Sequence, residues 1–235
     1  MRDQYAGDVS DVLKFGLLRA LTGNDRKLGM AWYYAPGHDG KPDGRHVEWQ
    51  SEKAWHSLDP IVALALSSLP ERSVRALQNA PFWPAGCRFH QEPMPHVLMR
   101  NEWAIQKRKA LDDCDIIFLD PDNGLGADPE KHATLAEVRE LRKPGRAIIF
   151  ITFPKRENHS QQVDQLHQDL RKETGAESVM TVRTHVRVPS LKDPKHLVPR
   201  VRWFTIVDGK ADLLNRAQIF ATALSSVPFA GAKIS

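Results

Sequence analysis

The sequence predicts an α/β fold built on a mainly parallel sheet, and three observations support this prediction. The run 115–119, D-I-I-F-L, is short and almost continuously apolar, which is typical of a strand buried on both faces of a parallel sheet. From this run to residue 224, strand patterns alternate with helix patterns. The last two strand patterns are joined by a segment, 186–200, that has no room for a covering helix, so we expect the last strand to be antiparallel.

The first half of the chain begins with an amphipathic helix. Apolar residues recur at helical spacing over 8–21, and the pair Gly23-Asn24 ends the pattern. A strand at 28–35 then runs into a loop that begins with Pro36-Gly37. The remaining elements expected before the central strand are helices at 52–67, 71–79 and 95–111 and a strand at 87–90.

The second half is more regular than the first. The central strand at 115–119 is followed by helices and strands in alternation, which implies right-handed crossovers. The expected helices are 134–142, 160–174 and 211–224, and the expected strands are 146–152, 178–185 and 202–207. We expect residues 1–235 to form a single α/β domain with a helical and Pro/Gly-rich insertion around 50–86.

Composition narrows the class of protein. Of the 235 residues, 41% are hydrophobic and 26% charged, which is typical of a folded globular protein. The N-terminal residues lack the apolar core of a signal peptide, and no apolar run approaches the ~18 residues that a membrane span needs. We therefore expect a cytoplasmic protein with no membrane partner; its oligomeric state is left open.

The charge balance is modestly basic. The formal net charge is +4 and the sequence pI is about 9.1. This balance favours an anionic partner such as nucleic acid, RNA or DNA, or it serves only to keep the protein in solution. Composition does not decide between the two.

A polar turn directly follows the central strand. It consists of Asp120, Pro121, Asp122, Asn123 and Gly124. The carboxyl ends of parallel strands open onto the crevice where ligands bind, so these carboxylates and this amide are placed to grip a planar polar ligand. The alternative is a turn without chemistry, since Asp, Asn and Gly all favour turns for reasons of backbone geometry.

The turn and the order of elements resemble the class I methyltransferases, whose fold is Rossmann-like. In the N6-adenine enzymes of that class, a motif D/N/S-P-P-Y/F/W follows the fourth strand, and Asp120-Pro121 matches its first half. Asp122-Asn123 stands where the motif has P-Y, so the aromatic that would stack on a flipped adenine is missing. The resemblance implies a mainly parallel sheet with an antiparallel last strand and S-adenosylmethionine as the cofactor.

The N-terminal segment carries a second resemblance. Residues 5–15, Y-A-G-D-V-S-D-V-L-K-F, are similar to the H-A-G-N-x-A-D-V-L-K-H opening of the bacterial large-subunit ribosomal RNA adenine N6-methyltransferase family. In that family the segment leads into the first helix beside the cofactor, and a loop L-D-T-H-A-G-A-G follows the next strand. Residues 34–40, Y-A-P-G-H-D-G, stand in the corresponding place.

These resemblances imply a set of site residues. Methyl transfer to an exocyclic amine needs acceptors that hold the nitrogen in line and draw off the positive charge that develops on it. The expected catalytic residues are Asp120, Pro121, Asp122 and Asn123. The expected cofactor-binding residues are Tyr5, Gly7, Lys14, Tyr34, Gly37, His38 and Asp39. The expected nucleic-acid-binding residues are Lys107, Arg108, Lys155 and Arg156.

Two alternatives belong to other functional classes. Asp120, Asp122, His38, Asp39 and Asp43 provide oxygen and imidazole ligands that suit a divalent metal, as in a metal-dependent nuclease or phosphoesterase. No metal is expected under the methyltransferase hypothesis. The second alternative is a non-catalytic Rossmann-like module that binds nucleic acid through its basic face.

Overall fold

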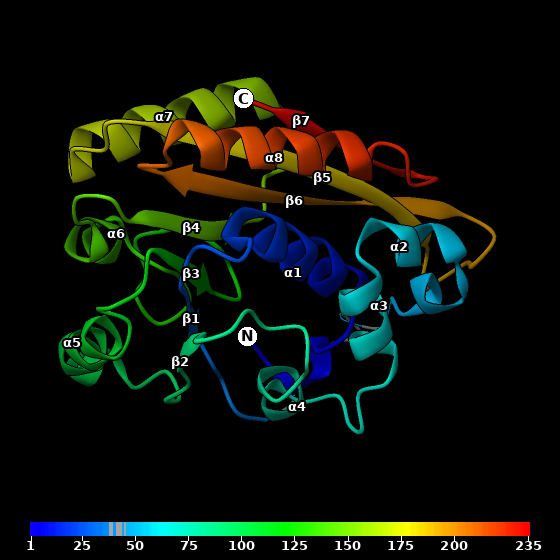
Figure 1. Ribbon diagram of the computed structural model, residues 1–235, viewed down its shortest axis with the longest axis horizontal. Helices are drawn as coiled ribbons and strands as arrows, with labels where there is room; N and C mark the ends of the chain where they lie inside the picture. The colour runs from blue at the N-terminus through cyan, green and yellow to red at the C-terminus, as the bar shows by residue number, and fades with distance from the viewer. Residues whose placement is uncertain (38–39, 41–43, 45) are drawn as a thin grey trace.

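The computed structural model describes residues 1–37, 40, 44 and 46–235 (Figure 1). The strands are β1 (Leu28–Trp32), β2 (Arg88–His90), β3 (Ile116–Asp120), β4 (Ala147–Thr152), β5 (Val179–Pro189), β6 (Leu197–Val207) and β7 (Ala230–Ile234). The α-helices are α1 (Val9–Thr22), α2 (Lys53–Leu58), α3 (Pro60–Ser67), α4 (Val74–Gln78), α5 (Arg100–Ala110), α6 (Leu135–Leu141), α7 (His159–Thr174) and α8 (Ala211–Leu224). Short 3-10 turns are η1 (Asp3–Tyr5), η2 (Glu48–Ser51) and η3 (Val97–Met99).

The strands form one sheet in the order β2-β1-β3-β4-β6-β5-β7. Strands β2, β1, β3 and β4 are parallel, and β6 lies antiparallel between β4 and β5. The predicted fold class is confirmed: this is a Rossmann-like α/β fold whose mainly parallel sheet ends in antiparallel strands. Strand β7, which pairs with β5, was not expected, because its sequence, A-G-A-K-I, has the propensity of a loop.

The helices cover both faces of the sheet, and alternate residues of each strand point to opposite layers. Ile116 and Phe118 of β3 pack into the core under α1 and α8, whereas Ile117 and Leu119 pack under α6 and α7. Helix α1 contacts α8 on the first face, and α6 contacts α5 and α7 on the second. Helices α2, α3 and α4 lie in the segment between β1 and β2, where the insertion was expected.

Proline and cap residues divide the helices more finely than periodicity suggested. The single helix expected at 52–67 is two helices, because Pro60 lacks the N–H that would continue α2 and Asp59 caps α3 through the amides of Ile61 and Val62. The helix expected at 95–111 begins at Arg100, after the turn η3. Among the described residues, no helix is both long and apolar enough to cross a membrane.

A buried ionic network holds α5 and α6 against the end of β1, and it corrects one prediction. Lys107, expected at a nucleic-acid surface, is 1% exposed, and its ammonium donates to Glu137 at 2.6 Å and to the Tyr33 hydroxyl at 2.9 Å. Arg100 donates to the same carboxylate at 3.0 Å. Burial lowers the pKa of Lys107 to about 8, although Glu137 opposes this shift. Lys107 is therefore a structural residue and does not reach the surface.

We expect Glu137→Gln to lower the free energy of unfolding by about 3–5 kcal/mol, because it leaves two buried cations without an anion. The matched control is Glu140→Gln on the same helix. Glu140 is 46% exposed and pairs with the exposed Arg108 at 3.7 Å, so its loss should cost less than about 1 kcal/mol. Urea denaturation of both variants measures the difference, and equal losses would contradict the assignment of the network.

Candidate functional site

Three neighbouring strands deliver side chains to one pocket at the edge where β3 and β4 end. Asp120 is the last residue of β3, Phe153 follows β4, and Arg202 lies in the first half of the antiparallel β6. Each lies two residues along its strand from a core residue that faces α1, namely Phe118, Ile151 and Phe204. Because side chains alternate along a strand, all three also project toward α1. The topological switch point lies beside them, because the chain leaves β1 toward β2 on one side and returns to β3 on the other.

The N-terminus of α1 supplies the floor of this pocket. Asp8 caps the helix by accepting a hydrogen bond from the Ser10 amide at 2.8 Å. One turn into the helix, Asp11 accepts a hydrogen bond from the Gly7 amide at 2.8 Å. Lys14 follows Asp11 by three residues and therefore lies on the same face of the helix. This turn of helix presents two carboxylates and one ammonium to the end of β3.

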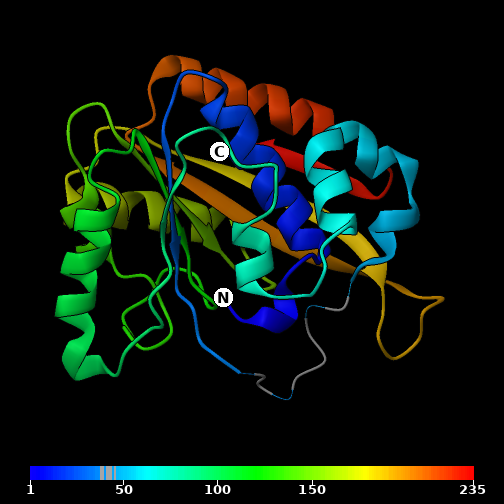
Figure 2. The same ribbon diagram turned by 60° about the horizontal axis from the view of Figure 1, so that its bottom comes forward.

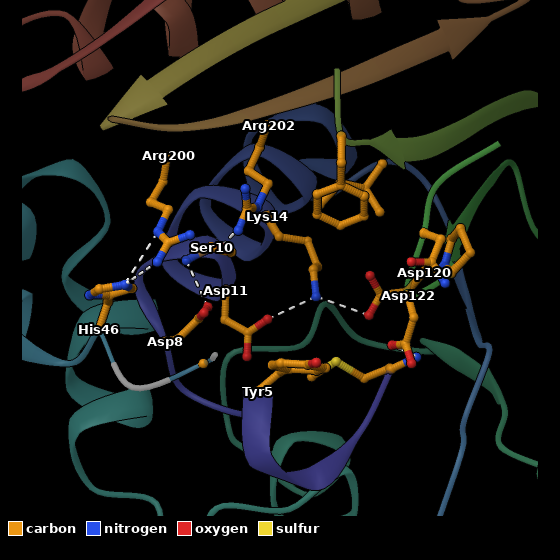
Figure 3. Close-up of a pocket in the computed structure, with 16 residues that line it drawn as sticks. Tyr5, Asp8, Ser10, Asp11, Lys14, His46, Asp120, Asp122, Arg200 and Arg202 are labelled. Atoms are coloured by element: carbon orange, nitrogen blue, oxygen red, sulfur yellow. Dashed lines mark hydrogen bonds and ion pairs between the residues drawn. The ribbon is translucent and has the colours of Figure 1, made fainter. Parts of the chain in front are cut away.

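Lys14 joins the helix to the strand. Its ammonium donates to Asp11 Oδ1 at 2.8 Å and to Asp120 Oδ2 at 2.9 Å, and all three side chains are at most 5% exposed (Figure 3). Burial alone would lower the pKa of Lys14, but the charges of the two carboxylates and the hydrogen bonds to them raise it above its usual value. Burial raises the pKa of Asp11 to about 6 against the opposing effect of Lys14.

The pocket has a volume of about 260 Å³, and charges of both signs line it. Figure 3 shows Arg200, Arg202 and His46 at one end and Asp120 and Asp122 at the other, with Lys14 between them. The arginines are held in place. The guanidinium of Arg200 contacts Nε2 of the buried His46, with Nε at 3.3 Å and Nη2 at 2.9 Å. Arg202 Nε donates to the Ser10 hydroxyl at 3.1 Å. Asp8 lies beside Ser10 near the two arginines, so the end that holds the guanidinium groups also holds a carboxylate.

The turn after β3 adopts the sharp conformation that its sequence suggests. Gly124 has a φ of +79°, and a Cβ there would lie 3.0 Å from the Cα of Thr152, so only glycine fits. Met1 lies beside this turn. Its amino group pairs with Asp122 at 2.5 Å and donates to the carbonyl oxygen of Tyr33, just past the end of β1, at 2.5 Å.

The structure brings together six of the expected site residues. Tyr5, Lys14, Asp120, Pro121, Asp122 and Asn123 all line the pocket. Gly7 lies behind it and binds Asp11 through its amide. Two expected cofactor residues point elsewhere: the Tyr34 hydroxyl donates to Asp3 at 2.9 Å, and Gly37 is exposed beyond the end of β1. His38, Asp39 and Asp43 lie outside the described residues.

The basic residues expected at a nucleic-acid surface are scattered. Lys107 is buried, as described above, and Arg108 is paired with Glu140 on the face of the sheet opposite α1. Lys155 and Arg156 are exposed in the loop after β4, close in sequence to Phe153 at the pocket. These four residues do not form one surface.

Sequence reasoning missed ten of the sixteen residues that line the pocket. The missed residues that line it are Met1, Asp8, Ser10, Asp11, Gly44, His46, Ile151, Phe153, Arg200 and Arg202. For Asp11 a signal was available, since it precedes Lys14 by one helical turn within the quoted motif. For the arginines the signal was the alternation R-V-R-W-F from 200 to 204, which places both on the face of Phe204.

Comparisons with known proteins give similarity of overall structure only. No family model and no curated protein matches the chain. A solved protein from Legionella pneumophila, described by the family model DUF519, has a TM-score of 0.47 and 14% identity, and the match covers 98% of this chain and 97% of that one. The SAM dependent methyltransferase from Agrobacterium tumefaciens has a TM-score of 0.40 and 14% identity, and the match covers 85% of this chain and 62% of that one. Neither description names the ribosomal RNA adenine family, so that resemblance stays a prediction from sequence.

We expect Lys14→Met to lower the free energy of unfolding by about 3–5 kcal/mol at pH 7.5, because Asp11 and Asp120 remain buried without a cation. The loss should shrink as the pH falls. The folded-state pKa of Asp11, already about 6, rises further without Lys14, whereas the unfolded chain takes up this proton only near 3.8. Between that raised pKa and pH 6 the folded variant therefore takes up a proton that neither its unfolded chain nor the folded unsubstituted protein takes up, and the deficit shrinks.

Urea denaturation at pH 7.5 and pH 5 measures this effect. The control is Lys27→Met, since Lys27 pairs with the exposed Asp113 and should cost less than about 1 kcal/mol at either pH. If Lys14→Met lowers the free energy of unfolding equally at both pH values, the two carboxylates do not depend on Lys14 for their charge.

Proposed function

We propose that this chain is an S-adenosylmethionine-dependent methyltransferase that acts on an amine of a nucleic-acid base. The observation that carries the proposal is the position of Asp120. This carboxylate ends the central strand at the switch point of the sheet, is 4% exposed, and faces a pocket of nucleobase dimensions. A buried carboxylate in that position suits the recognition of an N–H group.

Asp120 has one oxygen to offer. Lys14 occupies Oδ2, and among the described residues no donor contacts Oδ1. An exocyclic amine can donate one hydrogen to Oδ1 and the other to the main-chain carbonyl of Pro121, which lines the same pocket. Two acceptors in this arrangement direct the nitrogen lone pair away from them and stabilise the positive charge that nitrogen gains on attack.

Lys14 is a positioning residue in this proposal. Its bond to Oδ2 fixes the orientation of the carboxylate, so Oδ1 does not have to be ordered when the substrate arrives. Its charge also opposes the rise that burial causes in the pKa of Asp11. The proton that leaves nitrogen after methylation passes to Asp120 or to water at the open side of the pocket.

The residues near the switch point fit the cofactor. Bound there, S-adenosylmethionine would supply a methyl group on a sulfonium centre. The carboxylate of Asp122 lines the pocket and has the chemistry to accept the amino group of the cofactor. A pocket of about 260 Å³ is small for the cofactor and the base together, so we assign the pocket to the base.

The described residues do not supply the metal site that a metal-dependent nuclease or phosphoesterase would need. Among them, no three His, Cys, Asp or Glu side chains are arranged to hold a metal ion. Asp120 and Asp122 lie near each other, but Lys14 and the Met1 amino group, respectively, already pair with them. Metal analysis of the purified protein tests this alternative directly.

Calorimetric titration with S-adenosylmethionine and S-adenosylhomocysteine tests the cofactor. We expect micromolar binding of both by the protein without added metal. Undetectable binding, together with a stoichiometric divalent metal, would overturn the proposal in favour of a nuclease.

Transfer of a labelled methyl group from S-adenosylmethionine into bulk RNA or bulk DNA tests the reaction. We expect Asp120→Asn to reduce the rate at least 100-fold, because an amide offers one weak acceptor where the carboxylate offers charge, while cofactor affinity changes less than about threefold. The control is Asp112→Asn, whose carboxylate is 70% exposed at the opposite edge of the sheet. An Asp120→Asn variant that is folded, binds the cofactor and retains full activity would exclude Asp120 from the reaction.

A further inference from the structure

The positive charge of this protein is concentrated in one segment. Of the 33 Lys and Arg residues six lie in residues 183–202, whereas only one of the 29 Asp and Glu residues does. This segment of 20 residues therefore carries +5, and the other 215 residues together carry −1. The excess positive charge therefore lies in one segment. Charge that served only to keep the protein in solution would not need to be concentrated in this way.

The segment forms the distal part of the β5–β6 hairpin, which we call the basic arm. Thr152, the last residue of β4, pairs with Trp203, so residues 197–202 of β6 extend beyond the end of β4 together with the paired half of β5. Figure 2 shows the tip of this hairpin projecting from the body of the molecule. The base of the arm is the pocket, because Arg200 and Arg202 line it.

Three exposed cations of the arm have no acidic partner among the described residues. Arg187, Lys192 and Lys195 are exposed, and within the described part of the chain none has a carboxylate within 4 Å. The one acid of the arm, Asp193, accepts a hydrogen bond from the Lys195 amide. Some exposed cations elsewhere, such as Lys27 and Lys143, are paired with aspartates, whereas others are not. A row of uncompensated cations on an extended ribbon attracts a polyanion.

Two exposed aromatic rings accompany the arm. Phe153, 38% exposed, lies at the pocket under the guanidinium of Arg202, whose central carbon is 4.8 Å from the ring centre. Phe229 is 63% exposed, and its carbonyl accepts a hydrogen bond from the amide of Arg187. Exposed aromatic rings among cations are the features on which unpaired bases stack.

We propose that the basic arm binds single-stranded nucleic acid and leads it to the pocket, where Arg200 and Arg202 hold the phosphate next to the target base. This inference rests on the proposed function for the identity of the pocket's other end. Asp120 is level with Phe204 two strands away, and Arg202 lies two residues further along β6, so the two backbone positions are about 12 Å apart. The guanidinium groups of Arg200 and Arg202 and the carboxylate of Asp120 therefore offer binding groups to the two ends of one nucleotide.

Fluorescence anisotropy with a labelled 15-nucleotide single strand, as RNA and as DNA, tests the arm. The variant carries Arg187→Gln, Lys192→Gln and Lys195→Gln, three exposed positions outside the pocket. We expect at least tenfold weaker binding, and a plot of log affinity against log salt that is shallower by about 2, from roughly 0.7 per lost phosphate contact on a single strand.

The matched control carries Lys109→Gln, Arg139→Gln and Arg171→Gln. These three cations are also exposed and without an acidic partner among the described residues, and they lie on α5, α6 and α7 across the sheet. Equal weakening by both variants would reduce the effect to net charge and overturn the proposal. Larger weakening by Lys155→Gln with Arg156→Gln would move the binding surface to the loop after β4 and also overturn it.

Two competitors complete the test. A duplex of the same sequence should bind more weakly than the single strand, and a duplex that binds as tightly would overturn the single-strand assignment. Adenosine monophosphate should displace the labelled single strand poorly, because it reaches only Arg200 and Arg202. If it competes as well as an unlabelled single strand does, the arm takes no part in binding. Calorimetry with S-adenosylmethionine separates the two proposals: an arm variant that loses the oligonucleotide but keeps the cofactor supports the arm, whereas oligonucleotide binding without any cofactor binding removes only the proposed function.

Discussion

The buried contact of Lys14 with Asp11 and Asp120 ties together two segments that lie 106 residues apart in sequence. Burying three charges is costly unless each has a partner of opposite charge. The first turns of α1 must therefore lie against the end of β3 in the one position that pairs all three. Once that placement is set, the cap at Asp8, the turn at Gly124 and the pocket between them follow from local geometry. The motif in α1 and the motif after β3 are therefore halves of one site.

The antiparallel insertion of β6 between β4 and β5 is the second constraint. A strand that enters the sheet from the edge where β3 and β4 end brings its first residues, not its last, to the crevice. Because side chains alternate along a strand, Arg200 and Arg202 lie on the same face of β6 as Phe204 and Ile206. This face is hydrophobic where β6 lies in the core and cationic where β6 extends beyond it. One strand thereby serves both the core and the site.

Most of the fold could be predicted from the sequence, because apolar periodicity records burial directly: the strand at 115–119 and the helix at 211–224 were both placed within a residue or two. The site could be predicted only where local chemistry marks it, as at Asp120 and Lys14. Lys107 was misassigned because its partner, Glu137, is 30 residues away and no pattern links them. For Arg200 and Arg202, side-chain alternation shows the face of β6 on which they lie, but it does not show that β6 stands beside β4 at the pocket, because that depends on the order of strands in the sheet.

The distribution of charge also explains why the catalytic end of the pocket can be acidic in a protein that we propose binds a polyanion. Lys14 is shared between Asp11 and Asp120, so it offsets only part of the negative charge at that end. The exposed cations Arg187, Lys192 and Lys195, which have no acidic partner among the described residues, lie instead on the arm. In this proposal the arm holds the backbone of the strand away from these carboxylates, and only the base enters the pocket, where hydrogen bonds select it.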